Sequence, residues 1–183
     1  MSKNVQGVLF IDYVRMIKSK RDVDWSKYLT PDDMSFLEQN ILKSRWYPLD
    51  SFERMGVGIL KEIANGDMEL VRLFGKHSIE DLKDAHRHLV CEDNPRKSLM
   101  MFQELRKRFF DFDSIEVLEI QNDFAKLKIG YGMSKIAEEA ATYQTLGFFE
   151  ALLKISGASD VQHNFTSKSW EGDPETVLEL SWT

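Results

Sequence analysis

The apolar residues follow two different patterns along this chain, and the change falls near residues 111–113. In the first part apolar side chains recur every three or four positions, as at Val8, Ile11, Val14 and Ile17, which is typical of helices with one buried face. In the second part apolar and polar residues alternate, which is typical of half-buried strands. The sequence therefore predicts a helical part followed by a strand-rich part.

Several helix starts in the first part are marked by capping residues. Thr30 and Asn94 each precede a proline, and a polar cap followed by proline at the first helical position favours a helix start. Residues 45–48 are expected to be extended, because Pro48 disfavours helical geometry at the residue before it. Asp50 is expected to cap the helix that follows.

The sequence also predicts a helix boundary near Gly75 and an irregular N-terminus. Gly75 is expected to close a short helix over residues 67–74, because glycine commonly follows a helix end. Ser78 then starts a second helix. Residues 1–6 have no clear pattern and are expected to form a loose terminus.

The second part predicts two strand pairs separated by one long helix. The expected segments are strands over 115–120 and 125–131, a helix over 134–156, and strands over 161–166 and 178–182. This order predicts an α+β fold, in which an N-terminal helical bundle packs on a C-terminal ββαββ antiparallel sheet. We expect a single domain over residues 1–183, with a helical half at 7–110 and a ββαββ half at 114–183.

Composition narrows the classes of partner and the cellular setting. The formal net charge is −6, which disfavours nucleic-acid binding because that depends on neutralising phosphates with Lys and Arg. The one cysteine, Cys91, excludes an intrachain disulfide and suits a reducing compartment. No apolar run approaches the ~20 residues of a membrane span. We therefore expect a soluble, cytoplasmic protein without a membrane span.

The sequence offers no set of residues that would carry out catalysis. His86 and His88 are two residues apart on a predicted helix, which points them about 200° apart rather than at one metal ion. Glu92 and Asp93 follow Cys91, and their negative charges disfavour a reactive thiolate. We expect no catalytic residues, no metal site and no enzymatic activity.

Aromatic side chains are the candidates for binding. Arg45, Trp46 and Tyr47 form the most unusual cluster, and such residues either dominate binding surfaces or fill a core. Phe102 and Phe109 belong to a group rich in Phe and Met that could line a cavity or fill an ordinary core. The ligand-binding candidates are Arg45, Trp46, Tyr47, Phe102, Phe109 and Tyr131.

The C-terminal residues resemble a known family. Residues 147–153 (Gly-Phe-Phe-Glu-Ala-Leu-Leu), 156–158 (Ser-Gly-Ala), 172–174 (Gly-Asp-Pro) and 181–182 (Ser-Trp) are similar to the end of vinyl-4-reductase-type domains. Those domains share a fold with haem-NO-binding sensors and with small subunits of the Golgi TRAPP tethering complex. A related set of uncharacterised bacterial proteins also carries a Trp-Tyr-Pro followed by a phenylalanine, as this chain does at residues 46–48 and Phe52.

The resemblance implies a bacterial regulatory or sensory domain that binds a small hydrophobic molecule between its helices and its sheet. One alternative is a ligand-free adaptor that forms a homodimer or docks a partner protein. Another is a haem-based gas sensor with His77 as the axial ligand.

Two departures from the family limit what the resemblance implies. The Tyr-x-Ser-x-Arg signature of the haem-NO-binding sensors is not found in this sequence, so the motif does not support haem as a cofactor. Many relatives carry cysteines on either side of the Gly-Asp-Pro loop, where this chain has Ser169 and Thr176. Hydroxyl groups are poor ligands for soft metals, so no thiolate metal site is expected there.

Overall fold

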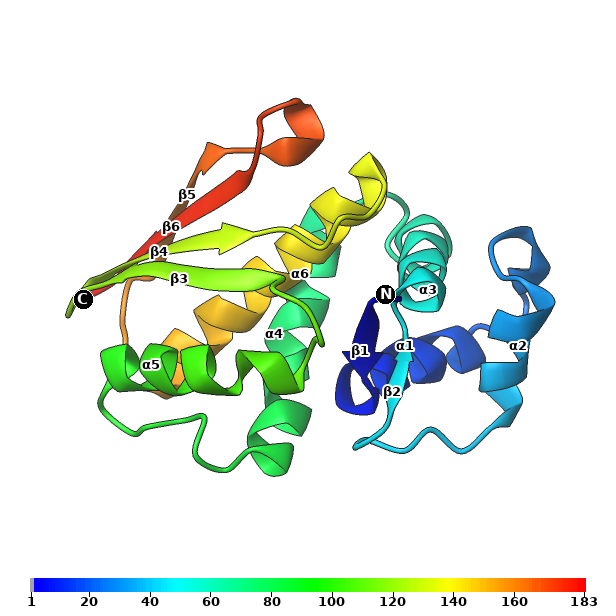
Figure 1. Ribbon diagram of the computed structural model, residues 1–183, viewed down its shortest axis with the longest axis horizontal. Helices are drawn as coiled ribbons and strands as arrows, with labels where there is room; N and C mark the ends of the chain where they lie inside the picture. Colours follow the sequence, from blue (N-terminus) through cyan, green and yellow to red (C-terminus); the bar gives the residue numbers. More distant parts are fainter. Residues whose placement is uncertain (1) are drawn as a thin grey trace.

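The alternating C-terminal segments form one four-stranded antiparallel sheet in the computed structural model, which describes residues 2–183. The strand order is β3-β4-β6-β5. The strands are β3 (Ile115–Ile120), β4 (Phe124–Ile129), β5 (Gln162–Ser167) and β6 (Thr176–Ser181), and the long helix α6 (Lys135–Ile155) lies across one face of the sheet (Figure 1). The predicted ββαββ arrangement and the α+β class are confirmed.

The first part of the chain is mainly helical, as predicted. Its α-helices are α1 (Gly7–Ser19), α2 (Pro31–Glu38), α3 (Leu49–Glu62), α4 (Met68–Ala85) and α5 (Pro95–Leu105), with short 3-10 turns at Trp25–Lys27 and Arg106–Arg108. Helices α4 and α5 belong spatially with the sheet, whereas α1, α2 and α3 gather on the other side of the molecule (Figure 1). Among residues 2–183, no helix is long and apolar enough to cross a bilayer.

Two of the predicted caps form as the sequence indicates. The Thr30 hydroxyl accepts a hydrogen bond from Asp33 N (3.2 Å), and the Asp33 carboxylate accepts one from Thr30 N (2.8 Å), which is a reciprocal capping arrangement. Asn94 caps α5 by accepting from Lys97 N at 2.9 Å. Asp50 is not the cap of its helix, because α3 begins one residue earlier, at Leu49.

The predicted helix break at Gly75 is wrong, because α4 continues through it to Ala85. Gly75 instead allows a close backbone approach: a Cβ there would lie 1.8 Å from the carbonyl oxygen of Gln144 on α6. Gly147 on α6 is similarly constrained, since its Cβ would lie 1.9 Å from the carbonyl oxygen of Arg72. Both glycines are required by the contact between two helices rather than by a helix end.

The predicted loose terminus is also wrong, because residues 4–6 form strand β1. This strand pairs antiparallel with β2 (Trp46–Pro48). On its other side, Gln6 N donates to Phe109 O (2.8 Å) and Asp111 N donates to Asn4 O (3.2 Å). The three-residue strand therefore connects the N-terminal helices to the segment that precedes the main sheet.

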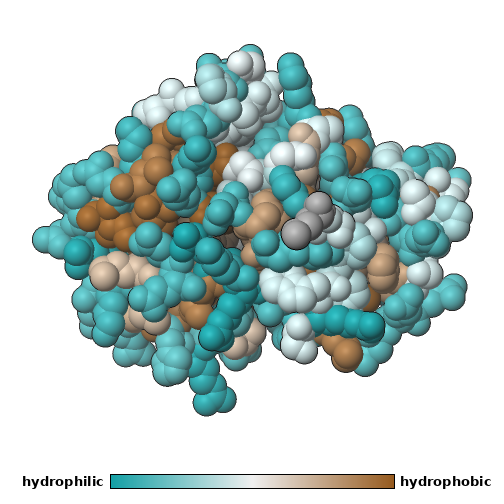
Figure 2. Space-filling model, viewed as in Figure 1, coloured by the Kyte–Doolittle hydropathy of each residue, from teal (hydrophilic) through white to brown (hydrophobic). Residues whose placement is uncertain are grey.

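The surface is ordinary for a globular protein with many charged residues. Figure 2 shows polar groups over most of one face, with apolar groups in patches, the largest over the part that holds the sheet. The large apolar side chains with the greatest exposure are Leu42, Trp46, Leu73, Met100, Leu118 and Ile155. Exposed apolar side chains are common on folded proteins and do not by themselves mark a function.

Candidate functional site

A mainly apolar cavity of about 70 Å³ lies between the N-terminal helices and the C-terminal half. Side chains from α1, α3, α4, α5, α6 and β3 contribute to it, together with the segments that precede β3 and follow β4. It is lined by Leu9, Asp12, Phe52, Ser78, Leu82, Phe102, Phe109, Phe110, Ile115, Tyr131, Ala141, Gln144, Thr145 and Phe148. Apolar cavities with few polar groups are the usual form of small-molecule sites.

The cavity has a closed apolar end and a more accessible polar end. Phe102, Phe109 and Phe148 are buried, and their rings contact one another, with centroids 5.9 Å apart for Phe102 and Phe109 and 5.6 Å apart for Phe102 and Phe148. Asp12 and Gln144 are only partly buried. The polar end therefore lies where α1, α4 and α6 meet.

The buried hydroxyl groups of the lining have their protons committed within the protein. Thr145 Oγ1 donates to Ala141 O at 2.8 Å, so the hydrogen in its 2.5 Å contact with Tyr131 comes from the Tyr131 hydroxyl. Burial raises the pKa of Tyr131, which keeps the phenol neutral. Ser78 Oγ likewise donates to Gly75 O at 2.7 Å.

Gln144 is different, because part of its side chain is not committed. The Tyr13 hydroxyl donates to Gln144 Oε1, which fixes the orientation of the carboxamide. Gln144 is only partly buried, and within residues 2–183 its Nε2 donates no hydrogen bond to another protein atom. A side-chain amide nitrogen carries two donors, so Gln144 presents unused donor capacity at the cavity.

A pair of carboxylates lies at the polar end of the cavity. Burial, followed by the nearby Asp81, raises the pKa of Asp12 to about 6. Arg15 Nη1 is 3.4 Å from both carboxylates, and Lys43 Nζ is 3.6 Å from Asp81. The positive charges of Arg15 and Lys43 offset part of the repulsion between Asp12 on α1 and Asp81 on α4.

The ligand candidates from the sequence divide between two places. Phe102, Phe109 and Tyr131 line the cavity, which places them where a ligand would bind, although their binding role stays a prediction. The lining residues that sequence reasoning missed include Asp12, Gln144 and Phe148. The helical period places Gln144 and Phe148 on one face of α6, but only the packing of α1 and α4 against that face shows that it is partly hollow.

Arg45, Trp46 and Tyr47 do not line this cavity. Tyr47 is a core residue, whose ring stacks on Phe10 with centroids 4.6 Å apart and whose hydroxyl accepts from Leu42 N at 3.0 Å. Trp46 is 41% exposed, and Arg45 is exposed as well. The core-filling interpretation therefore describes Tyr47, and any ligand bound by this cluster would occupy a different site.

The histidines lie outside the cavity lining. His77, the predicted axial ligand, is exposed on α4. His86 lies nearer, with its ring edge against Phe109 at a centroid distance of 5.1 Å, and its buried Nε2 has no hydrogen-bond partner. Within the described chain, no three His, Cys, Asp or Glu side chains converge as metal ligands. Ser169 and Thr176 lie side by side, with their hydroxyl oxygens 2.9 Å apart.

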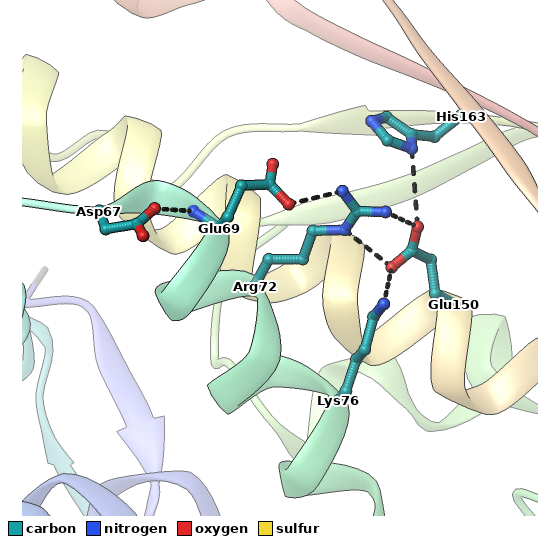
Figure 3. Close-up of polar contacts among 6 residues, drawn as sticks. All are labelled: Asp67, Glu69, Arg72, Lys76, Glu150 and His163. Carbon is teal, nitrogen blue, oxygen red and sulfur yellow. Dashed lines mark hydrogen bonds and ion pairs between the residues drawn. The ribbon is translucent and has the colours of Figure 1, made fainter. Parts of the chain in front are cut away.

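A charged cluster away from the cavity connects α4, α6 and β5 (Figure 3). The buried carboxylate of Glu150 accepts from Arg72 Nε at 2.9 Å and lies 3.0 Å from Lys76 Nζ. His163 Nδ1 is 3.6 Å from the same carboxylate. Burial opposes ionisation of Glu150, but the hydrogen bonds from the two cations outweigh it and lower the pKa. The buried Glu150 charge is therefore paired within the protein, as buried charges usually are.

The architecture is that of the H-NOX fold. An H-NOX protein from S. oneidensis in the Fe(II)NO state is 12% identical and superposes with a TM-score of 0.66, covering 97% of this chain and 99% of that one. An Fe(II) unliganded H-NOX mutant from K. algicida is 14% identical, with a TM-score of 0.64 over 97% and 96% of the two chains.

A third solved structure has the same arrangement. An oxygen-binding H-NOX domain related to soluble guanylate cyclases gives a TM-score of 0.63 at 12% identity, over 97% of this chain and 95% of that one. No protein-family model and no curated protein matches the sequence. At these identities the likeness establishes the fold, as the sequence resemblance predicted. Of the functions expected from the sequence, the haem-sensor alternative agrees best with these neighbours.

The residues around the cavity do not fit a haem group. The volume of about 70 Å³ is well below the roughly 300–1,000 Å³ of typical ligand and cofactor sites. No His, Cys or Met side chain is among the lining residues, although these are the usual axial ligands along with Tyr. The lining Tyr131 is followed by Met133 and Lys135 rather than the Ser and Arg of the haem-NO-binding signature.

Proposed function

We propose that this protein is a non-enzymatic sensory domain that binds a small, mainly apolar molecule directly in the cavity between its helices and its sheet. The observation that carries the proposal is the cavity itself, which has five phenylalanines and a single accessible polar end. An apolar cavity of about 150 Å³ in another protein binds benzene or xenon. About half that volume suits a ligand of three or four heavy atoms.

The position of the cavity supports a sensory role. Its lining comes from both halves of the chain, so occupancy stabilises contacts between elements far apart in sequence. A ligand can shift a conformational equilibrium only through different affinities for the two states, and a cavity between two halves provides that difference when the halves separate. The H-NOX fold of the neighbours agrees with this role better than with a ligand-free dimeric adaptor.

Xenon binding tests the proposal directly. Under xenon pressure we expect the amide and methyl NMR signals of residues lining the cavity to shift with xenon concentration. Ala141→Met, which fills the cavity from α6, should abolish these shifts. Ala151→Met on the same helix, outside the lining, should leave them unchanged. Absence of any xenon-dependent shift at the cavity in the wild-type protein would overturn the proposal.

A haem sensor is the second candidate, and one observation favours it. His86 has a buried Nε2 without a hydrogen-bond partner, and its ring lies against Phe109 of the cavity wall. Outward movement of the Phe109 ring would bring the His86 imidazole to the cavity. Absorption spectra of the purified protein, before and after adding haem, separate the two candidates. We expect no Soret band from bound haem. A stoichiometric Soret band that disappears in His86→Ala would favour the haem sensor instead.

A further inference from the structure

The cavity has one uncommitted neutral hydrogen-bond donor, and this restricts the chemistry of its ligand. The hydroxyl protons of Tyr131, Thr145 and Ser78 are all used within the protein. Those three oxygens retain only acceptor capacity. Among these lining groups in residues 2–183, Gln144 Nε2 keeps donors that no protein atom uses, while Gln144 Oε1 is taken by Tyr13.

The orientation of the Gln144 carboxamide is fixed before any ligand arrives. Its Oε1 accepts from the Tyr13 hydroxyl, and Tyr13 is itself held by stacking on Phe52, with ring centroids 4.1 Å apart and planes within 5°. The oxygen and nitrogen of a carboxamide diverge at a fixed angle from the same planar carbon, so holding Oε1 on the Tyr13 hydroxyl of α1 directs Nε2 to another side of the group. A donor that is already oriented loses less entropy on binding than a free side chain.

We propose that the ligand is a small molecule with an apolar body of three or four heavy atoms and one hydrogen-bond acceptor, such as a short ketone, and that Gln144 Nε2 donates to this acceptor. The apolar body contacts Phe102, Phe109 and Phe148. This inference rests on the proposed function, because it assigns the ligand class of the same cavity. A ketone oxygen accepts from Gln144 Nε2 and brings no proton that needs an acceptor of its own.

Acetone and isobutene provide a matched pair of test ligands, because they have the same heavy-atom framework and differ in the oxygen. We would follow their binding by NMR titration, using the signals of cavity-lining residues. Gln144→Met keeps the length of the side chain and removes the donor. It should weaken acetone binding about five- to tenfold, the value of one hydrogen bond, and change isobutene binding less than twofold.

Two further variants keep the test decisive. Gln162→Met on β5 is exposed and should change neither ligand's affinity. Tyr13→Phe leaves the donor in place but releases its orientation, so it should weaken acetone about two- to threefold without affecting isobutene; it also serves if Gln144→Met does not fold.

The outcomes separate the ligand class from the site itself. Equal losses of acetone and isobutene binding in Gln144→Met, or no loss of either, would overturn the acceptor preference while leaving a cavity that binds xenon. Failure of xenon, acetone and isobutene alike to shift any cavity signal would instead reject the proposed function.

Discussion

Arg72 on α4, which is partly exposed, pairs with the buried carboxylate of Glu150 on α6 beside the close approach of their two helices. Arg72 Nε lies 2.9 Å from Glu150 Oε2, and the carbonyl of the same arginine lies against Gly147, one turn before Glu150. Charge pairing and backbone packing therefore act on the same segment of α6. The two contributions can be separated by substitution.

Arg72→Ala should lower the free energy of unfolding more than Glu69→Ala, which removes an exposed partner of the same arginine. Arg72→Ala leaves the buried Glu150 with Lys76 and the more distant His163. Loss of one member of a buried pair costs about 3–5 kcal/mol; because Lys76 remains, we expect about 2–3 kcal/mol. Glu69→Ala removes a contact whose carboxylate side is 65% exposed and should cost less than about 0.5 kcal/mol. Urea unfolding of both variants provides the measurement, and equal costs would contradict this account.

Gly147→Ala should destabilise the protein by about 3 kcal/mol, because the added Cβ would lie 1.9 Å from Arg72 O and the backbone has to move. Gly130→Ala is the control, since a Cβ there has no neighbour within 4 Å. Thermal unfolding of the two variants should give a large fall in Tm for the first and little change for the second. A stable Gly147→Ala protein would show that α4 and α6 are farther apart than described.

Asp12 should make stability fall as pH rises from about 4 to 6. Its folded pKa of about 6 lies above the ordinary aspartate pKa of 3.8, so the folded state binds more protons than the unfolded state within this window. The contribution is present below pH 4 and is lost as Asp12 ionises beside Asp81, up to about 3 kcal/mol in total. Denaturation of Asp12→Asn over pH 4–7 should show a flatter profile than wild type, and the exposed Asp22→Asn should not. An unchanged profile in Asp12→Asn would exclude this coupling.

Asp33 should make the stability of the protein fall as the pH is lowered below about 4. Burial alone would raise its pKa, but hydrogen bonds from Arg54, Ser51 and Thr30 outweigh it and hold the pKa well below the usual range. The stabilisation is therefore present above pH 4 and is lost as pH falls. Arg54→Met should cost about 2 kcal/mol at pH 7 and less at pH 3, measured by urea unfolding; a penalty that is equal at both values would contradict the proposed pairing.

The elements of the second half could be predicted because their pattern is local. Alternation along β4 and β6, and the long apolar helix between the strand pairs, are set by residues close in sequence. The helix break predicted at Gly75 was wrong, because glycine is common both at helix ends and where two helices cross. Only the contact with Gln144 on α6, far away in the sequence, shows that Gly75 belongs to a crossing. Strand β1 was missed because three residues carry no periodicity, and its partners lie about 40 and 105 positions away.

The candidate site could be predicted only in part. Phe102, Phe109 and Tyr131 were identified from their aromatic character, which indicates burial but not the hollow beside it. Gln144 could not be identified, because its significance depends on Tyr13, 131 positions away, occupying one end of its amide. Arg45 and Trp46 stood out by composition, yet they lie outside the cavity.

Strand β1 has a practical consequence for anyone who produces this protein. Residues 4–6 bond to β2 on one side and to residues 109–111 on the other, and the latter segment carries Phe109 and Phe110 of the cavity wall. Truncating the first six residues would release that wall, and a bulky tag fused immediately before them would strain it. The last residue is held as well, since Thr183 exchanges two backbone hydrogen bonds with Ser159. An affinity tag at either end therefore needs a generous spacer if ligand-binding measurements are to report on the intact site.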